Sequence, residues 1–174
     1  AGFRFAKPTI EDFFESTDHT AVDRLDLHRY MGTWYEIASF DHRFERGLSE
    51  VTATYTLMPD GTVRVENRGC KHKKPYDVCK TAEGRAKIPD PSQPGKLKVS
   101  FFLSFYSDYY VLELDQDEYN YALIGSSSDK YLWILSRAPI LPEEIKKKLL
   151  DAATRRGYDV KKLIWVEQRE KKIM

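Results

Sequence analysis

Few side chains of this 174-residue sequence have the types and spacing that catalysis or metal binding requires. The four histidines (His19, His28, His42 and His72) fall in the N-terminal segment or in expected loops, and none forms an H-x-x-x-H pair. The run GSSSD at 125–129 lacks the G-x-S-x-G frame of a serine nucleophile. A glycine-rich phosphate loop is also missing from the sequence. These features predict a binding protein that is not an enzyme and needs neither a metal nor a cofactor.

The two cysteines, Cys70 and Cys79, are separated by eight residues. No further Cys or His group stands at zinc-binding spacing beside them. A pair across a short loop favours a disulfide bond over two free thiols. A disulfide in turn favours an oxidising compartment.

Length and charge narrow the class of protein further. The chain suits one domain, and its 28 basic and 27 acidic residues give a net charge of +1. That balance gives no reason to expect a nucleic-acid partner, which calls for a basic face. No apolar stretch approaches the roughly 20 residues of a membrane-spanning helix. The N-terminus has no apolar signal core, so the protein is either not exported or has already lost a signal peptide.

Alternation of apolar and polar residues predicts eight consecutive strands with short connections. They cover residues 33–40, 51–58, 62–69, 80–88, 96–103, 109–115, 119–125 and 131–137. A short helical turn at 26–32 precedes them. The pattern then changes to a helical period at 141–158, and a last strand-like run follows at 160–168. This order predicts an all-β fold, an eight-stranded up-and-down antiparallel barrel with a C-terminal helix and a final short strand outside it. We expect an N-terminal arm at 1–22, the barrel domain at 23–169 and a tail at 170–174.

Strand alternation also predicts which side chains face the inside of the barrel. The expected lining is aliphatic and aromatic with a few polar groups, as in small-molecule pockets. The residues expected to contact a ligand are Trp34, Glu36, Ala38, Phe40, Ala53, Tyr55, Val65, Asn67, Val99, Phe101, Tyr110, Leu112, Ile124, Tyr131 and Trp133, and Val51, Leu97 and Leu135 face inward with them.

The alternative to a cavity is a barrel filled by its own side chains. An inward Glu36 would be costly in a solid core without a partner, and inward tyrosine hydroxyls need partners too. A cavity holding water or an amphipathic ligand would provide partners for Glu36 and for the tyrosine hydroxyls. A pair between Glu36 and an arginine would provide a partner for Glu36 alone. The pattern favours the cavity.

Three motifs in order resemble the signature regions of the lipocalin family. They are Gly32-x-Trp34 after a helical turn, Asp117 with Tyr119 and Tyr121, and Arg137 at the end of WILSR. The runs GTWYEIASFDHRFERGL, VTATYTL, LKVSFF and YLWILSRAP are similar to the bacterial outer-membrane lipocalins of the Blc type, with apolipoprotein D next. The resemblance implies that Trp34 lies at the closed end of the barrel with Arg137 packed across it. It also implies that Asn67, Tyr110 and Trp133 line the pocket.

The resemblance further implies binding of a fatty acid, lysophospholipid or phospholipid, for transport or storage in the cell envelope under stress. The bacterial members are lipoproteins that face the periplasm. No anchoring Cys stands near this N-terminus, so contact with a membrane through a lost lipid anchor is an expectation only. The disulfide would close the loop between the third and fourth strands at the open rim. We expect a monomer or a homodimer.

Loops at the open end carry basic residues, Arg43, Arg46, Lys71, Lys73 and Lys74. They form either a solvated rim or a cationic collar for a lipid carboxylate or phosphate. Two alternative functions remain. One is an envelope protein with a nearly filled barrel whose rim binds a protein partner. The other is a carrier of a sterol, retinoid, tetrapyrrole or bilin.

Overall fold

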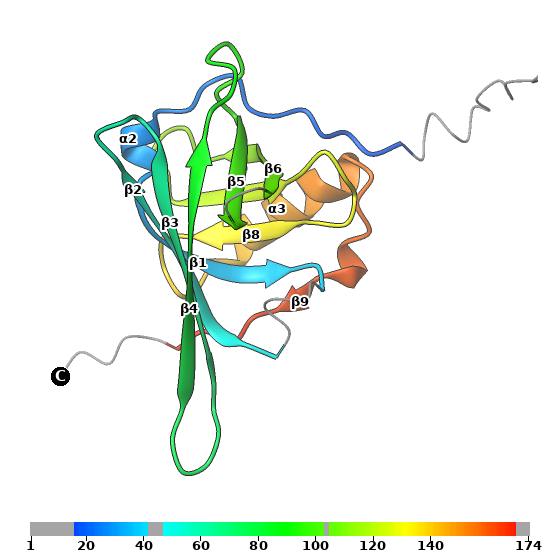
Figure 1. The fold of residues 1–174 in the computed structure, drawn as a ribbon. Helices are drawn as coiled ribbons and strands as arrows, with labels where there is room; N and C mark the ends of the chain where they lie inside the picture. Colours follow the sequence, from blue (N-terminus) through cyan, green and yellow to red (C-terminus); the bar gives the residue numbers. More distant parts are fainter. Residues whose placement is uncertain (1–15, 42–46, 103–104, 170–174) are drawn as a thin grey trace, which may run out of the picture.

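The computed structural model describes residues 16–41, 47–102 and 105–169. Eight antiparallel strands form the barrel, in the order β2-β3-β4-β5-β6-β7-β8-β1, and pairing of β1 with β2 closes it. Their bounds are β1 Gly32–Ser39, β2 Ser49–Leu57, β3 Val63–Lys71, β4 Val78–Lys87, β5 Lys96–Phe102, β6 Phe105–Leu114, β7 Tyr121–Gly125 and β8 Trp133–Ser136. The predicted barrel is therefore confirmed (Figure 1).

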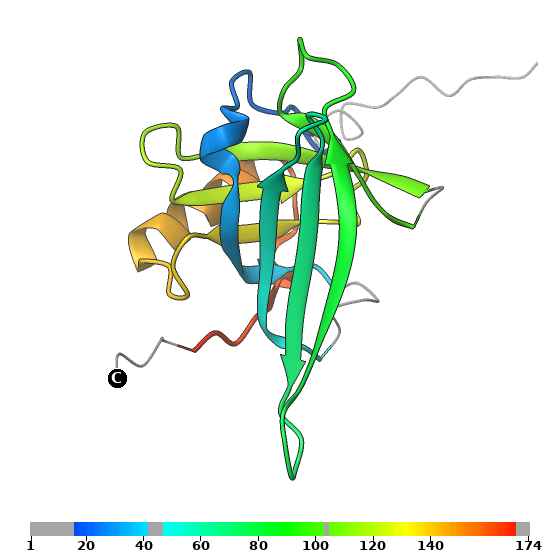
Figure 2. The same cartoon turned by 60° about the vertical axis from the view of Figure 1, so that its left-hand side comes forward.

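Helices and a ninth strand complete the fold. The turn α2, Leu27–Tyr30, precedes β1, and its N-cap Asp26 accepts hydrogen bonds from the amides of His28 and Arg29. The helix α3, Glu143–Arg155, lies on the flank of the barrel (Figure 1, Figure 2). After the 3-10 turn Val160–Lys162, strand β9, Ile164–Trp165, pairs with β1 outside the barrel. Both the helix and the last strand were predicted. None of the helices in the described part of the chain has the length and apolarity that a membrane crossing needs.

The buried apolar side chains form two cores. One fills the barrel and includes Trp34, Tyr55, Val65, Leu97 and Ile124. The other lies between the barrel and α3 and includes Leu149 and Ala153 of the helix. The apolar stripe of α3 therefore covers the outer face of the barrel instead of contributing to its inside.

Four residues predicted to face into the barrel belong to the core under the helix. Ala38 and Phe40 lie there because the register of β1 against β8 shifts between Glu36 and Ala38, which moves the later residues to the other face. On β6, Tyr110 and Leu112 pack in this outer core, while Tyr109 and Val111 pack in the barrel. The inward prediction was wrong for these four.

The C-terminal segment closes the seam where β1 and β2 separate. The amide of Val166 donates to the carbonyl of Ile37 at 2.9 Å, and the amide of Glu50 donates to the carbonyl of Glu167 at 2.7 Å. The side chain of Gln168 donates to the carbonyls of Glu36 and Val51, at 2.7 and 2.9 Å. Backbone groups that lack a strand neighbour at this point thus find partners in the tail.

Candidate functional site

The closed end of the barrel is built around Trp34, which is fully buried. Its indole Nε1 donates to the carbonyl of Tyr30 at 2.9 Å, and the guanidinium of Arg137 lies 3.8 Å from the ring centre. Arg137 also donates to the carbonyls of Arg29, Thr33 and Tyr119. Gly32 has φ +101, and a Cβ there would stand 3.2 Å from the Arg137 guanidinium, so both backbone and space favour glycine. The expected stacking of Arg137 on Trp34 is confirmed.

Three tyrosine hydroxyls meet just above this floor. The hydroxyl of Tyr109 lies 2.5 Å from that of Tyr30 and 2.9 Å from that of Tyr55. Burial raises the pKa of Tyr30 and Tyr109 well above the usual tyrosine value, because a phenolate here would lose its hydration. A hollow of only about 10 Å³ remains beside them, lined by residues that include Leu27, Tyr55 and Leu97. That is about the space of one water molecule, so the barrel is essentially filled at this depth.

On the inward faces of β3, β5 and β8, exposure increases from the closed end to the mouth. Val65, Leu97 and Leu135 are buried, at 2, 4 and 4% exposed, whereas Ile124 of β7, which pairs with Trp133, stays buried at 0%. Ala53, Asn67, Val99 and Trp133 are half-buried, and Phe101 and Tyr131 reach 36 and 39% exposure. Five of these predicted lining residues, Ala53, Val65, Val99, Ile124 and Trp133, pack in the barrel core, where Trp133 stacks on Tyr131 with ring centres 5.7 Å apart. Toward the mouth these strands therefore present apolar side chains that are partly accessible to solvent.

Two polar groups of the predicted lining lie on this face. Glu36 follows Trp34 by two positions on β1 and is 3% exposed. Asn67 is half-buried and pairs with two small residues, Ala53 on β2 and Ala82 on β4. A carboxyl group and an amide within an apolar lining are groups that can orient an amphipathic ligand.

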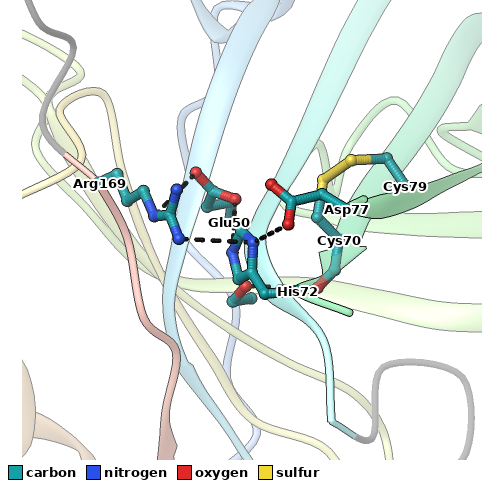
Figure 3. The surroundings of a disulfide bond; sticks show 7 residues. Glu50, Cys70, His72, Asp77, Cys79 and Arg169 are labelled. Atoms are coloured by element: carbon teal, nitrogen blue, oxygen red, sulfur yellow. Dashed lines mark hydrogen bonds and ion pairs between the residues drawn. A yellow bond between two sulfur atoms is a disulfide. The ribbon is translucent and has the colours of Figure 1, made fainter. Parts of the chain in front are cut away.

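The hairpin between β3 and β4 stands at the mouth and holds the disulfide. Cys70 and Cys79 are directly opposite each other in the ladder and are bonded, as the sequence predicted (Figure 3). The ring of His72 lies between two carboxylates, with Nε2 3.1 Å from Glu50 and Nδ1 2.8 Å from Asp77. Arg169 of the tail adds a contact to Glu50 at 3.7 Å. These contacts join the hairpin to the start of β2 and to the tail.

The predicted rim charges are only partly within the described residues. Lys71, Lys73 and Lys74 are exposed on the β3–β4 hairpin, whereas Arg43 and Arg46 lie outside the described ranges. Sequence reasoning missed the contributions of Tyr109, of the His72 contacts and of Gln168. Tyr109 could have been found by testing both registers of its strand, but side-chain contacts between distant segments leave no periodic signal. Within the described residues no group of three or more His, Cys, Asp or Glu side chains could hold a metal.

The family model of the lipocalin-like domain matches residues 25–168. The outer membrane lipoprotein Blc of Escherichia coli K12 is 49% identical over 149 residues, which cover 86% of this chain and 82% of that protein. Temperature-induced lipocalin-1 of Arabidopsis thaliana is 43% identical over 158 residues, covering 86% of this chain and 82% of that protein. Mouse apolipoprotein D is 34% identical over 154 residues, which cover 84% of this chain and 78% of that protein.

Solved structures have the same architecture at lower identity. Insecticyanin from the tobacco hornworm superposes with a TM-score of 0.71 at 23% identity, covering 89% of this chain and 87% of that one. The cockroach allergen Per a 4 gives a TM-score of 0.67 at 18% identity, with 90 and 96% covered. At this identity the likeness concerns the fold alone. The matched family model, the curated relatives and the closed barrel with Arg137 across Trp34 agree: the chain belongs to the lipocalin family.

Proposed function

We propose that this protein binds a lipid with one or two acyl chains in the mouth half of its barrel and carries or stores it. The observation that supports this most is the graded exposure of the inward faces of β3, β5 and β8. Their apolar residues are buried at the closed end, and Val99 and Trp133 are half-buried nearer the mouth. An acyl chain that entered there would gain about 0.8 kcal/mol of binding free energy for each CH₂ group that it buries.

The filled closed end limits how deep such a chain reaches. Tyr30, Tyr55 and Tyr109 join their hydroxyls above Trp34 and leave a hollow of about 10 Å³. The lipid would therefore stop at these tyrosines, with its polar group at the mouth near Asn67 and Tyr131. Fatty acids and lysophospholipids suit this arrangement because one end is apolar and the other polar.

We further propose that the protein works in the bacterial cell envelope, as a lipoprotein facing the periplasm. The relatives from Escherichia coli and Vibrio cholerae are outer membrane lipoproteins by name, at 49 and 45% identity. The Cys70–Cys79 disulfide fits an oxidising compartment. No catalytic role is part of the proposal.

Titration with a fatty acid tests the binding, with the emission of the three tryptophans, Trp34, Trp133 and Trp165, as the signal. Because Trp34 is sealed and Trp133 is half-buried at the mouth, a bound acyl chain should change mainly the Trp133 emission. The change should saturate in the wild type and largely disappear in Trp133→Phe. A signal that never saturates, for fatty acid or lysophospholipid, contradicts the proposal.

A further inference from the structure

The hairpin of β3 and β4 extends beyond the rest of the barrel in both views (Figure 1, Figure 2). Every residue from 71 to 83 is exposed. Among them Tyr76 is 75% exposed and Val78 is 53% exposed, two large apolar side chains that the fold leaves in water. An exposed aromatic at the end of a projecting hairpin contributes nothing to the barrel core, so its role is expected outside the molecule.

The same segment concentrates positive charge. Residues 71–80 contain Lys71, Lys73, Lys74 and Lys80 against one acid, Asp77, a net charge of +3 with His72 neutral. The whole chain carries only +1. Within the described residues none of the first three lysines has an ion pair, while Asp77 is engaged by His72 at 2.8 Å. The positive charge of the tip is therefore available to a partner, while its one acid, Asp77, is held by the ring of His72.

The base of the hairpin is fixed to the barrel, as Figure 3 shows. The disulfide joins its two strands, and His72 contacts Glu50 of β2 at 3.1 Å. Glu50 in turn forms an ion pair with Arg169 of the tail at 3.7 Å. A partner that binds the tip is thereby held in a set orientation to the barrel mouth, which lies at the same end.

We propose that the hairpin tip, residues 71–80, is a docking surface for anionic lipid bilayers. Lysines beside a tyrosine suit the membrane interface, where the aromatic ring lies at headgroup level and the ammonium groups meet lipid phosphates. A protein partner fits less well, because lysine is depleted in protein–protein interfaces. The docking does not depend on which ligand the barrel holds.

Vesicle flotation tests the proposal with the whole chain. Wild-type protein should float with vesicles of equimolar phosphatidylcholine and phosphatidylglycerol, bind vesicles of phosphatidylcholine alone much less, and dissociate as salt is raised. Lys73→Glu with Lys74→Glu should lower the partition coefficient at least about tenfold. Tyr76→Ser should lower it several-fold at every salt concentration. The matched control is Lys147→Glu with Arg155→Glu on exposed positions of α3, which should bind as the wild type does.

A second measurement separates docking from ligand binding. The Lys73→Glu, Lys74→Glu variant should keep the wild-type affinity for monomeric fatty acid. Equal losses toward vesicles and toward fatty acid would assign the lysines to the ligand collar and overturn the docking surface. So would equal binding of the wild type to neutral and anionic vesicles, or an equal loss in the α3 control. Failure of fatty acid to bind, with vesicle docking intact, would contradict the proposed function alone.

Discussion

Arg137 lies across Trp34 with its guanidinium carbon 3.8 Å from the ring centre, and it donates to three backbone carbonyls from separate segments. One side chain thus holds together the turn before β1, β1 itself and the connection between β6 and β7. Burial lowers the pKa of Arg137 from its usual value, but a guanidinium stays charged. The closed end is therefore a structural unit separate from the proposed lipid site.

Arg137→Ala should lower the free energy of unfolding by about 2 to 4 kcal/mol, because it removes a cation–π contact and leaves carbonyls without donors. Urea denaturation measures this. Arg137→Lys should recover part of the loss, since it keeps a charge over Trp34 but not the fork of donors. Acyl affinity of the folded variant should be unchanged. A stability equal to the wild type would contradict the bracing role of Arg137.

Trp133→Ala should weaken fatty-acid binding at least about tenfold, as removal of a buried aromatic contact commonly does. The change leaves the closed end intact, so the thermal transition should remain cooperative. Trp165→Ala is the matched control, since Trp165 is 44% exposed on β9, outside the barrel. Calorimetric titration of both variants gives the comparison. If both bind as the wild type does, Trp133 is not part of the lipid site.

Stability should fall steeply at high pH because of buried tyrosines. Burial raises the pKa of Tyr158 from 10.0 to about 12, and burial raises those of Tyr30 and Tyr109 as well. The unfolded chain ionises its tyrosines near 10 while the folded chain keeps these protonated, so unfolding becomes easier as pH rises from about 10 toward 12. Tyrosinate absorbance should show a class of tyrosines that ionise at higher pH than the rest. The Tyr158→Phe variant should have one tyrosine fewer in that class. Titration of all tyrosines together would contradict the burial.

Cys79→Ser with Cys70→Ser should cost about 2 to 3 kcal/mol of stability, the chain-entropy value for so short a loop. Hydrogen exchange should rise at the amides of the hairpin, residues 69–80, and stay at wild-type levels in the strands near Trp34. His72→Ala with the disulfide intact should raise exchange at the same hairpin to a lesser extent. A rise spread over the whole barrel would show that the bond supports the fold and not this hairpin alone.

The sequence predicts the barrel well because strand alternation and turn residues are local signals. It fails on β6, where Tyr109, Tyr110, Val111 and Leu112 are all apolar and either register is acceptable. It fails on β1 because the irregularity between Glu36 and Ala38 has no signature in residue type. The alternation of apolar and polar residues predicts which face of the sheet a side chain occupies only while the strand register is unbroken.

Sequence reasoning also could not predict the side-chain contacts between distant segments. Gln168 joins β1 and β2 with one amide group, and His72 joins Glu50 to Asp77. Each depends on the closed barrel bringing the tail and the hairpin to the same end. The lysines at 71, 73 and 74 illustrate the same point, because their position on a projecting hairpin is a property of the length of β3 and β4.

Mass spectrometry of the lipids that copurify with the folded protein tests the central claim most directly. The protein should be purified without detergent, extracted with organic solvent and compared with the Trp133→Ala variant prepared in parallel. The account predicts a fatty acid, lysophospholipid or phospholipid in the wild-type extract at a molar ratio near that of the protein, and much less from the variant. An extract free of acyl lipid, or one holding a sterol, retinoid or tetrapyrrole instead, would contradict it.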